Sequence, residues 1–193
     1  APYPIPSVAL DDPSFVRPIP HNCWGGASQA LTALRAPRWM DHYGRSAELG
    51  HLMARWCEAL QRDMSFRQQL DPLTGAFTEG DAPGYSPSSL LMVDFSWRLA
   101  GISEGPDEVE WNVRPGIGAS RKARFRLKLR GGTAEMRYGH EGAMLTFAGR
   151  RLARVRGTAR VVTDASGKMT ALVGITASTQ EVELKRPGKP SNR

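Results

Sequence analysis

The sequence predicts an α+β protein in which helices come first and an antiparallel β-sandwich follows. In three stretches between residues 26 and 101, apolar residues recur at spacings of three and four, the period of an amphipathic helix. From about residue 104, apolar and charged residues alternate instead, as they do in a half-buried strand. The charge changes at the same place, because residues 1–103 hold eight Lys and Arg against ten Asp and Glu, and residues 104–193 hold eighteen against nine.

We therefore expect a helical module over residues 1–103, a β-sandwich over residues 104–186 and a flexible tail over residues 187–193. The chain has 193 residues, 40% hydrophobic and 23% charged, which is typical of a globular protein. No apolar run approaches the roughly 20 residues that span a bilayer, so we expect a soluble protein without membrane contact. Cys23 and Cys57 lack the spacing of a metal site and are too few for a disulfide framework, so we expect buried free thiols. Two thiols do not fix the compartment, and a cytoplasmic location is favoured over secretion.

Residues 1–21 are rich in proline, which fixes φ and removes backbone donors, so we expect an extended arm laid over a surface. The acidic pair Asp11 and Asp12 stands just before Pro13. Two interpretations of these carboxylates stay open: hydrogen bonds to sugar hydroxyls, or capping of a turn. Because the sequence begins with Ala1 rather than Met, we expect a processed chain or a fragment of a longer one.

Two helices are expected in the first part of the chain. The first should begin near Gly26 and end or kink near Arg35, because Pro37 cannot donate a helical hydrogen bond. The second should have Ser46 as its N-cap and run to about Asp63, with an apolar stripe facing the core.

A third helix is expected to have Ser86 as N-cap, Pro87 at its first position and Gly101 as its C-terminal stop. Residues 90–100 are apolar on nearly every side, which is typical of a helix buried among others. Three helices cannot easily enclose such a helix, so we infer that a partner surface outside this sequence covers part of it.

The second half of the chain shows regular turn signals between alternating segments, for example Gly131-Gly132 and residues 164–167. Short strands at this spacing are typical of an antiparallel sandwich. We expect strands at residues 110–114, 124–130, 133–138, 143–147, 150–156, 158–163, 169–176 and 180–184.

A loop at residues 66–75 connects the second and third helices and ends in Asp71-Pro72-Leu73-Thr74-Gly75, a turn signal. With three other segments it resembles the C-terminal end of six-hairpin, (α/α)6-barrel glycosidases, the group that contains processing α-glucosidase, trehalase-like enzymes and mannosylglycerate hydrolase. The matching segments, in order, are Pro6-Ser7 with Asp12-Pro13-Ser14-Phe15, then Trp24-Gly25-Gly26-Ala27, then Gln68-Gln69-Leu70-Asp71-Pro72-Leu73-Thr74-Gly75, then Tyr85-Ser86-Pro87.

The resemblance implies the last α-hairpins of an (α/α)6 barrel over residues 1–103 and the inverting hydrolysis of an O-glycosidic bond. Inversion needs two carboxyl groups, an acid and a base that activates water. The resemblance places the acid in an earlier hairpin, absent from this sequence, and we expect that hairpin on a separate N-terminal chain of the same enzyme. It places the base at Gln68, but an amide cannot take a proton from water near pH 7. Glu79 is the nearest substitute and Asp81 the next; otherwise Gln68 marks an inactive carbohydrate-binding protein.

Other side chains in these segments are candidates for sugar contacts. The indole of Trp24 suits the apolar face of a pyranose, or it packs in the core. Asp12, Asn22, Asp81 and Tyr85 complete the predicted carbohydrate-binding set, with a carbohydrate as the expected partner. The histidines are too scattered for a metal site, so we expect no metal and no cofactor. The basic strands match the solvent face of a sheet, so nucleic acid is not an expected partner.

Overall fold

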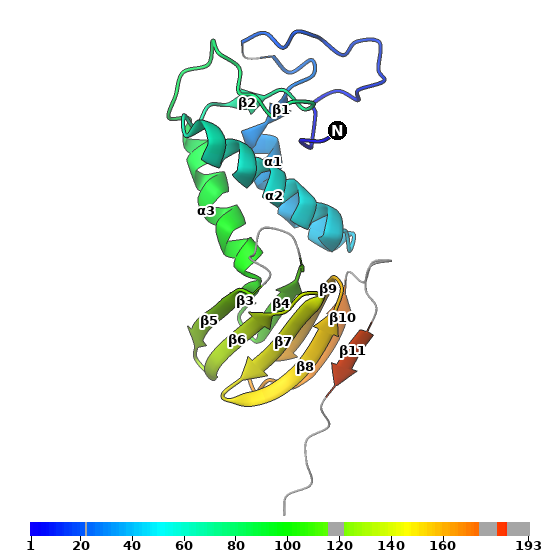
Figure 1. Ribbon diagram of the computed structural model, residues 1–193, viewed down its shortest axis with the longest axis vertical. Helices are drawn as coiled ribbons and strands as arrows, with labels where there is room; N and C mark the ends of the chain where they lie inside the picture. The colour runs from blue at the N-terminus through cyan, green and yellow to red at the C-terminus, as the bar shows by residue number, and fades with distance from the viewer. Residues whose placement is uncertain (22, 116–121, 174–180, 185–193) are drawn as a thin grey trace, which may run out of the picture. The chain divides into compact units, whose positions relative to one another are not determined.

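The computed structural model describes residues 1–21, 23–115, 122–173 and 181–184 (Figure 1). The chain divides into two compact units, Ala1–Leu99 and Ala100–Arg193. The division comes earlier than the predicted boundary after residue 103, because Ile102–Glu104 form strand β3, which pairs with β4. The predicted tail at residues 187–193 lies outside the described residues.

The first unit contains α1 (Ala30–His42), α2 (Ser46–Asp63) and α3 (Ser86–Ala100), and the short strands β1 (Ser28–Gln29) and β2 (Gln69–Leu70). The predicted apolar stripe of α2 is buried at spacings of three and four, and includes Leu49, Leu52, Met53, Trp56 and Leu60. The N-cap of α2 is Arg45, one residue before the predicted Ser46, and its side chain makes no capping hydrogen bond. None of the helices described combines the length and apolar character needed to span a bilayer.

Helix α1 departs from the prediction at both ends. It begins at Ala30, because Ser28 and Gln29 pair with β2 instead of continuing the helix. It continues through Pro37 to His42, although proline removes one helical hydrogen bond. Ala33, Ala36 and Met40 are buried on both sides of this position, and we attribute the continuous helix to the packing of that face.

Helix α3 has two contrasting faces. Leu91, Phe95 and Leu99 are buried, whereas Leu90, Val93 and Trp97 are exposed by 59%, 70% and 53%. The prediction that the helix is buried on nearly every side is therefore wrong for this chain. This exposed apolar face is the part of α3 that a partner outside this sequence is expected to cover.

The second unit consists of two antiparallel sheets (Figure 1). Sheet 1 has the order β10-β9-β4-β3, with β3 (Ile102–Glu104), β4 (Glu108–Val113), β9 (Ala159–Asp164) and β10 (Met169–Val173). Sheet 2 has the order β11-β8-β7-β6-β5, with β5 (Arg124–Leu129), β6 (Gly132–Tyr138), β7 (Gly142–Phe147), β8 (Arg150–Arg156) and β11 (Glu181–Leu184).

The eight predicted strands are confirmed to within a few residues, apart from the end of the segment predicted at residues 169–176, since residues 174–180 lie outside the described part. The mixture of helices with antiparallel sheets agrees with the α+β class. The described residues do not form a barrel.

The sheets share one hydrophobic core, which contains Trp111 and Val161 from sheet 1 and Met136, Leu145 and Phe147 from sheet 2. Two aromatic side chains inside it make hydrogen bonds through their polar atoms. Trp111 donates its indole N–H to Thr163 Oγ1 at 3.1 Å. The Tyr138 hydroxyl accepts from the Arg114 backbone N–H at 3.1 Å and donates to the Asn112 carbonyl at 3.2 Å. Burial raises the pKa of Tyr138.

Candidate carbohydrate-binding surface

The loop that follows β2 folds as the tight turn that its sequence predicts. Asp71 Oδ1 accepts hydrogen bonds from the backbone N–H groups of Leu73 and Thr74, at 2.7 and 3.2 Å. Gly75 has φ +71°, and a Cβ there would lie 2.5 Å from the ring of Tyr3. Glycine is therefore required both by the backbone and by the close approach of the arm.

The N-terminal arm was predicted to lie over a surface, and it contacts this turn. Tyr3 donates its backbone N–H to the Pro72 carbonyl at 2.9 Å, and Arg17 pairs with Asp71 at 3.2 Å. The buried Trp56 of α2 donates its indole N–H to the Pro4 carbonyl at 2.6 Å. The arm is thus hydrogen-bonded both to the loop and to a helix.

The buried side-chain amide of Gln69 joins the segment at Pro20 and Cys23 to the segment at Thr78. Gln69 Oε1 accepts the backbone N–H of Cys23 at 2.9 Å, and its Nε2 donates to Thr78 Oγ1 at 3.0 Å and to the Pro20 carbonyl at 2.8 Å. Because Cys23 N and Thr78 Oγ1 bond to one amide, they lie within about 8 Å of each other. Gln29 adds a further bond to Gln69 Oε1 at 2.7 Å.

The residues that follow Cys23 and Thr78 in the sequence, Trp24 and Glu79, are exposed. Trp24 comes directly after Cys23, and its side chain is 53% exposed. Glu79 follows Thr78 in a turn closed by the Asp81 N–H on the Thr78 carbonyl at 3.2 Å, and it is exposed. The structure therefore presents an exposed indole and an exposed carboxylate from two segments attached to the same amide.

Asp81, the last residue of that turn, contacts His21. Asp81 is buried, and its Oδ1 lies 2.5 Å from Nδ1 of His21, whose side chain is 62% exposed. This contact engages Oδ1 of Asp81 and joins His21 to the turn that carries Glu79. Asp81 is the second predicted substitute for the base, and its burial and its contact with His21 are those of a residue that positions the turn.

The remaining predicted residues differ in their placement. Gln68 is half-buried and donates to Gln29 Oε1 at 3.3 Å, so its amide belongs to the scaffold. Tyr85 is half-buried and donates its backbone N–H to Phe66 at 2.8 Å, at the start of the loop. Asp12 is exposed and accepts bonds from the Ser14 N–H and hydroxyl, which lower its pKa; this supports the turn-capping interpretation. Asn22 lies outside the described residues.

Gln29 and Gln69 lie at the centre of the surface that carries Trp24 and Glu79, but they are not among the predicted site residues. No local pattern distinguishes them, because the contact joins positions 40 residues apart. Cys23 and Cys57 are free thiols; Cys57 is buried as expected, and Cys23 is half-buried. Among the described residues, no group of three His, Cys, Asp or Glu is placed to hold a metal ion.

Comparison of the chain with protein-family models, with curated proteins and with solved structures finds no match. The chemistry available at this surface must therefore be judged from its own residues. An exposed indole can stack on a sugar, and an exposed carboxylate can accept hydrogen bonds or activate water.

Proposed function

We propose that the surface carrying Trp24 and Glu79 binds a carbohydrate, and that this chain is one part of a glycoside hydrolase. The bond cleaved would be an O-glycosidic bond of an oligosaccharide or small glycoside, with inversion. The observation that supports this proposal is the joint attachment of the Trp24 and Glu79 segments to the Gln69 amide. An aromatic platform and a carboxylate are the minimum that sugar binding and water activation require.

Inversion also requires a general acid, which we assign to a second chain of the same enzyme. The exposed stripe of Leu90, Val93 and Trp97 on α3 is a surface that such a chain would cover. In this assignment Glu79 is the base and Gln68 keeps the loop in place through Gln29.

A second function is favoured by one observation. At position 68 the resembling glycosidases have the Glu that serves as their catalytic base. Here Gln68 occupies that position, and its amide hydrogen-bonds to Gln29 within the first unit. A protein that binds carbohydrate without cleaving it needs Trp24 but no base. The two functions share the surface and differ only in the role of Glu79.

Calorimetric titration of the purified chain with neutral di- and trisaccharides tests the binding surface. Replacement of the indole in Trp24→Ala should weaken binding about tenfold or more, since the stacking contact is lost. Trp97→Ala is the matched control, because the Trp97 indole is equally exposed at 53% on α3. Absence of binding in the wild type, or equal losses in both variants, would overturn the proposal.

Release of aryl groups from a panel of aryl glycosides tests catalysis by the protein purified from its source, after mass spectrometry has identified any co-purifying chain that would supply the acid. Glu79→Gln should lower kcat about 10²- to 10⁴-fold, the range expected when a general base is removed. Glu48→Gln, an exposed carboxylate on α2, should have wild-type turnover. Sugar binding without release by the wild-type chain together with its co-purifying chain, or by a chain that co-purifies with no other, would leave the carbohydrate-binding function and exclude the hydrolase.

A further inference from the structure

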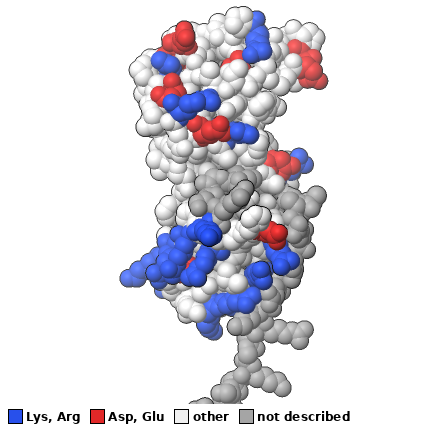
Figure 2. All heavy atoms as spheres, viewed as in Figure 1, with Lys and Arg blue, Asp and Glu red and all other residues white. Residues whose placement is uncertain are grey.

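The outward face of sheet 2 is strongly basic at its β5 and β6 end. Side chains alternate along these strands, so that Phe125, Leu127 and Met136 face the core and charged residues face outwards. Figure 2 shows Lys and Arg gathered over this part of the molecule. We define the basic face by its four outward cations, Arg124, Arg126, Lys128 and Arg137.

One carboxylate is shared by three of these cations. Glu135 lies 2.6 Å from Arg124, 3.0 Å from Arg137 and 3.4 Å from Arg126. The hydrogen bond from Arg124 contributes most to holding the pKa of Glu135 below its usual range. A single negative charge cannot balance three positive ones, so the cluster keeps a net positive charge.

Protection of a sheet edge does not account for this arrangement. Lysine and arginine on an edge strand prevent unwanted pairing, and β5 is the edge strand of sheet 2. Arg137, however, is on the interior strand β6 and stands directly opposite Arg124 in the register. Like charges in opposite positions destabilise a sheet. Glu135 bridges the two arginines and offsets part of this repulsion, and the remaining positive charge is available to an anionic ligand.

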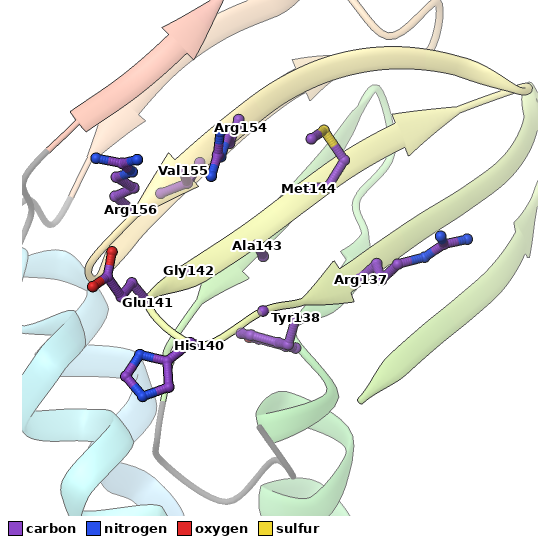
Figure 3. A pocket seen from close by; sticks show the side chains of 11 residues that line it. Arg137, Tyr138, His140, Glu141, Gly142, Ala143, Met144, Arg154, Val155 and Arg156 are labelled. Atoms are coloured by element: carbon purple, nitrogen blue, oxygen red, sulfur yellow. The ribbon is translucent and has the colours of Figure 1, made fainter. Parts of the chain in front are cut away.

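A pocket of about 370 Å³ adjoins the basic face at Arg137. Figure 3 shows it at the turn between β6 and β7, where His140 and Glu141 project, with Met144 and Arg154 on the neighbouring strands. On β8, Arg154 stands opposite Met144 in the register, and Met144 stands opposite Arg137. The pocket thus continues the basic face with a hollow that has both polar and apolar walls.

We infer that the basic face of sheet 2 binds an anionic polysaccharide, with one acidic sugar unit seated in the pocket beside Arg137. Three of the four cations are arginines, whose planar forks suit the carboxylate and sulfate groups of such a chain. Along β5 the cations recur at every second residue, roughly 6.8 Å apart, so they can follow an extended polymer. The inference stands apart from the surface at Trp24, which lies in the other unit.

Nucleic acid fits this face less well. Single strands are bound largely by stacking on aromatic side chains, and among the described residues of β5 to β8 none of the outward-facing side chains is aromatic. The major groove of duplex DNA admits an α-helix or a two-stranded β-ribbon, whereas β5 to β8 are adjacent strands of one five-stranded sheet. A flat anionic membrane would not use the pocket.

Affinity measurements on the full chain test the inference with a heparin hexasaccharide and a hexagalacturonate as probes. Arg126→Gln with Arg137→Gln should weaken binding of at least one probe by about tenfold or more and reduce its salt dependence. Arg35→Gln with Arg38→Gln removes the same charge from exposed positions on α1 and should change affinity less than twofold. Thermal unfolding should show that both double variants remain folded.

Measurements with other ligands complete the experiment. Maltohexaose, which is neutral, should not compete with the acidic probes. Tighter binding of a 20-nucleotide single strand or a DNA duplex, or of phosphatidylserine vesicles, would overturn the inference in favour of those ligands. Equal losses in the two double variants, or no binding of either acidic probe by the wild type, would also overturn it.

Discussion

Gln69 is the residue on which the candidate surface depends. Its buried amide makes bonds to segments that are far apart in sequence, at Pro20, Cys23 and Thr78. Its neighbour Gln68 was the residue that the resemblance to glycosidases marked as the position of the base. The turn itself was predictable, because Asp71 and Gly75 have the local preferences that the turn uses. The contact between Gln29 and Gln69 was not, because no local preference specifies it.

Cys57 provides a prediction at the same scale. Burial raises the pKa of its thiol to about 11, with a smaller opposing contribution from the Ser96 hydroxyl. A raised pKa in the folded state stabilises the protein below the unfolded thiol pKa of about 9, and this stabilisation is lost as pH rises towards 11. The free energy of unfolding should therefore fall by roughly 2 kcal/mol from this group between those pH values.

Urea unfolding of the wild type and of Cys57→Ala between pH 8 and 11 measures this contribution. Tyrosines and lysines titrate in both proteins, so the difference between the two curves isolates the thiol. The variant should start less stable and lose less stability with rising pH. Parallel curves would show that Cys57 titrates normally in the folded protein.

Among the elements, the strands of the second unit were the easiest to predict. Alternation is a local pattern, and it places β5 to β9 within a residue or two of their observed ends. Strand β3 was missed because three residues are too few to show a period. The start of α1 was wrong because Ser28 and Gln29 form a strand only by pairing with β2, a contact that the helix-like spacing of nearby alanines does not reveal.

Helix α3 gives a prediction that separates its two faces. Leu91 is fully buried and its neighbour Leu90 is 59% exposed, so the same substitution meets opposite surroundings. Leu91→Ala should destabilise the chain by about 2–5 kcal/mol, the usual cost of a cavity in the core. Leu90→Ala should change stability by about 0.5 kcal/mol or less.

Chemical denaturation of both variants provides the measurement, with circular dichroism at zero denaturant to show that each is folded. If Leu90→Ala were as costly as Leu91→Ala, the exposed stripe of α3 would be covered within this chain. The need for a partner chain on that face would then disappear.

At the scale of the whole molecule, each compact unit has its own core. Trp56 is fully buried in the first unit and Trp111 in the second, beside residues of the same unit. The change in sequence period and charge near residue 104 indicated this division, although β3 moves the boundary to Leu99 and Ala100. Each proposed site lies inside one unit, since the surface at Trp24 belongs to the first and the basic face to the second.

Two separate cores predict two separable unfolding transitions in calorimetry. Trp111→Phe should lower the midpoint of one transition, because a buried indole and its bond to Thr163 are lost, at a cost of about 1–3 kcal/mol. Trp56→Phe should lower the other, because the bond from its indole to Pro4 is lost. If either substitution moves both midpoints together, the units unfold as one cooperative body, and a ligand bound at the basic face would then stabilise the surface at Trp24 as well.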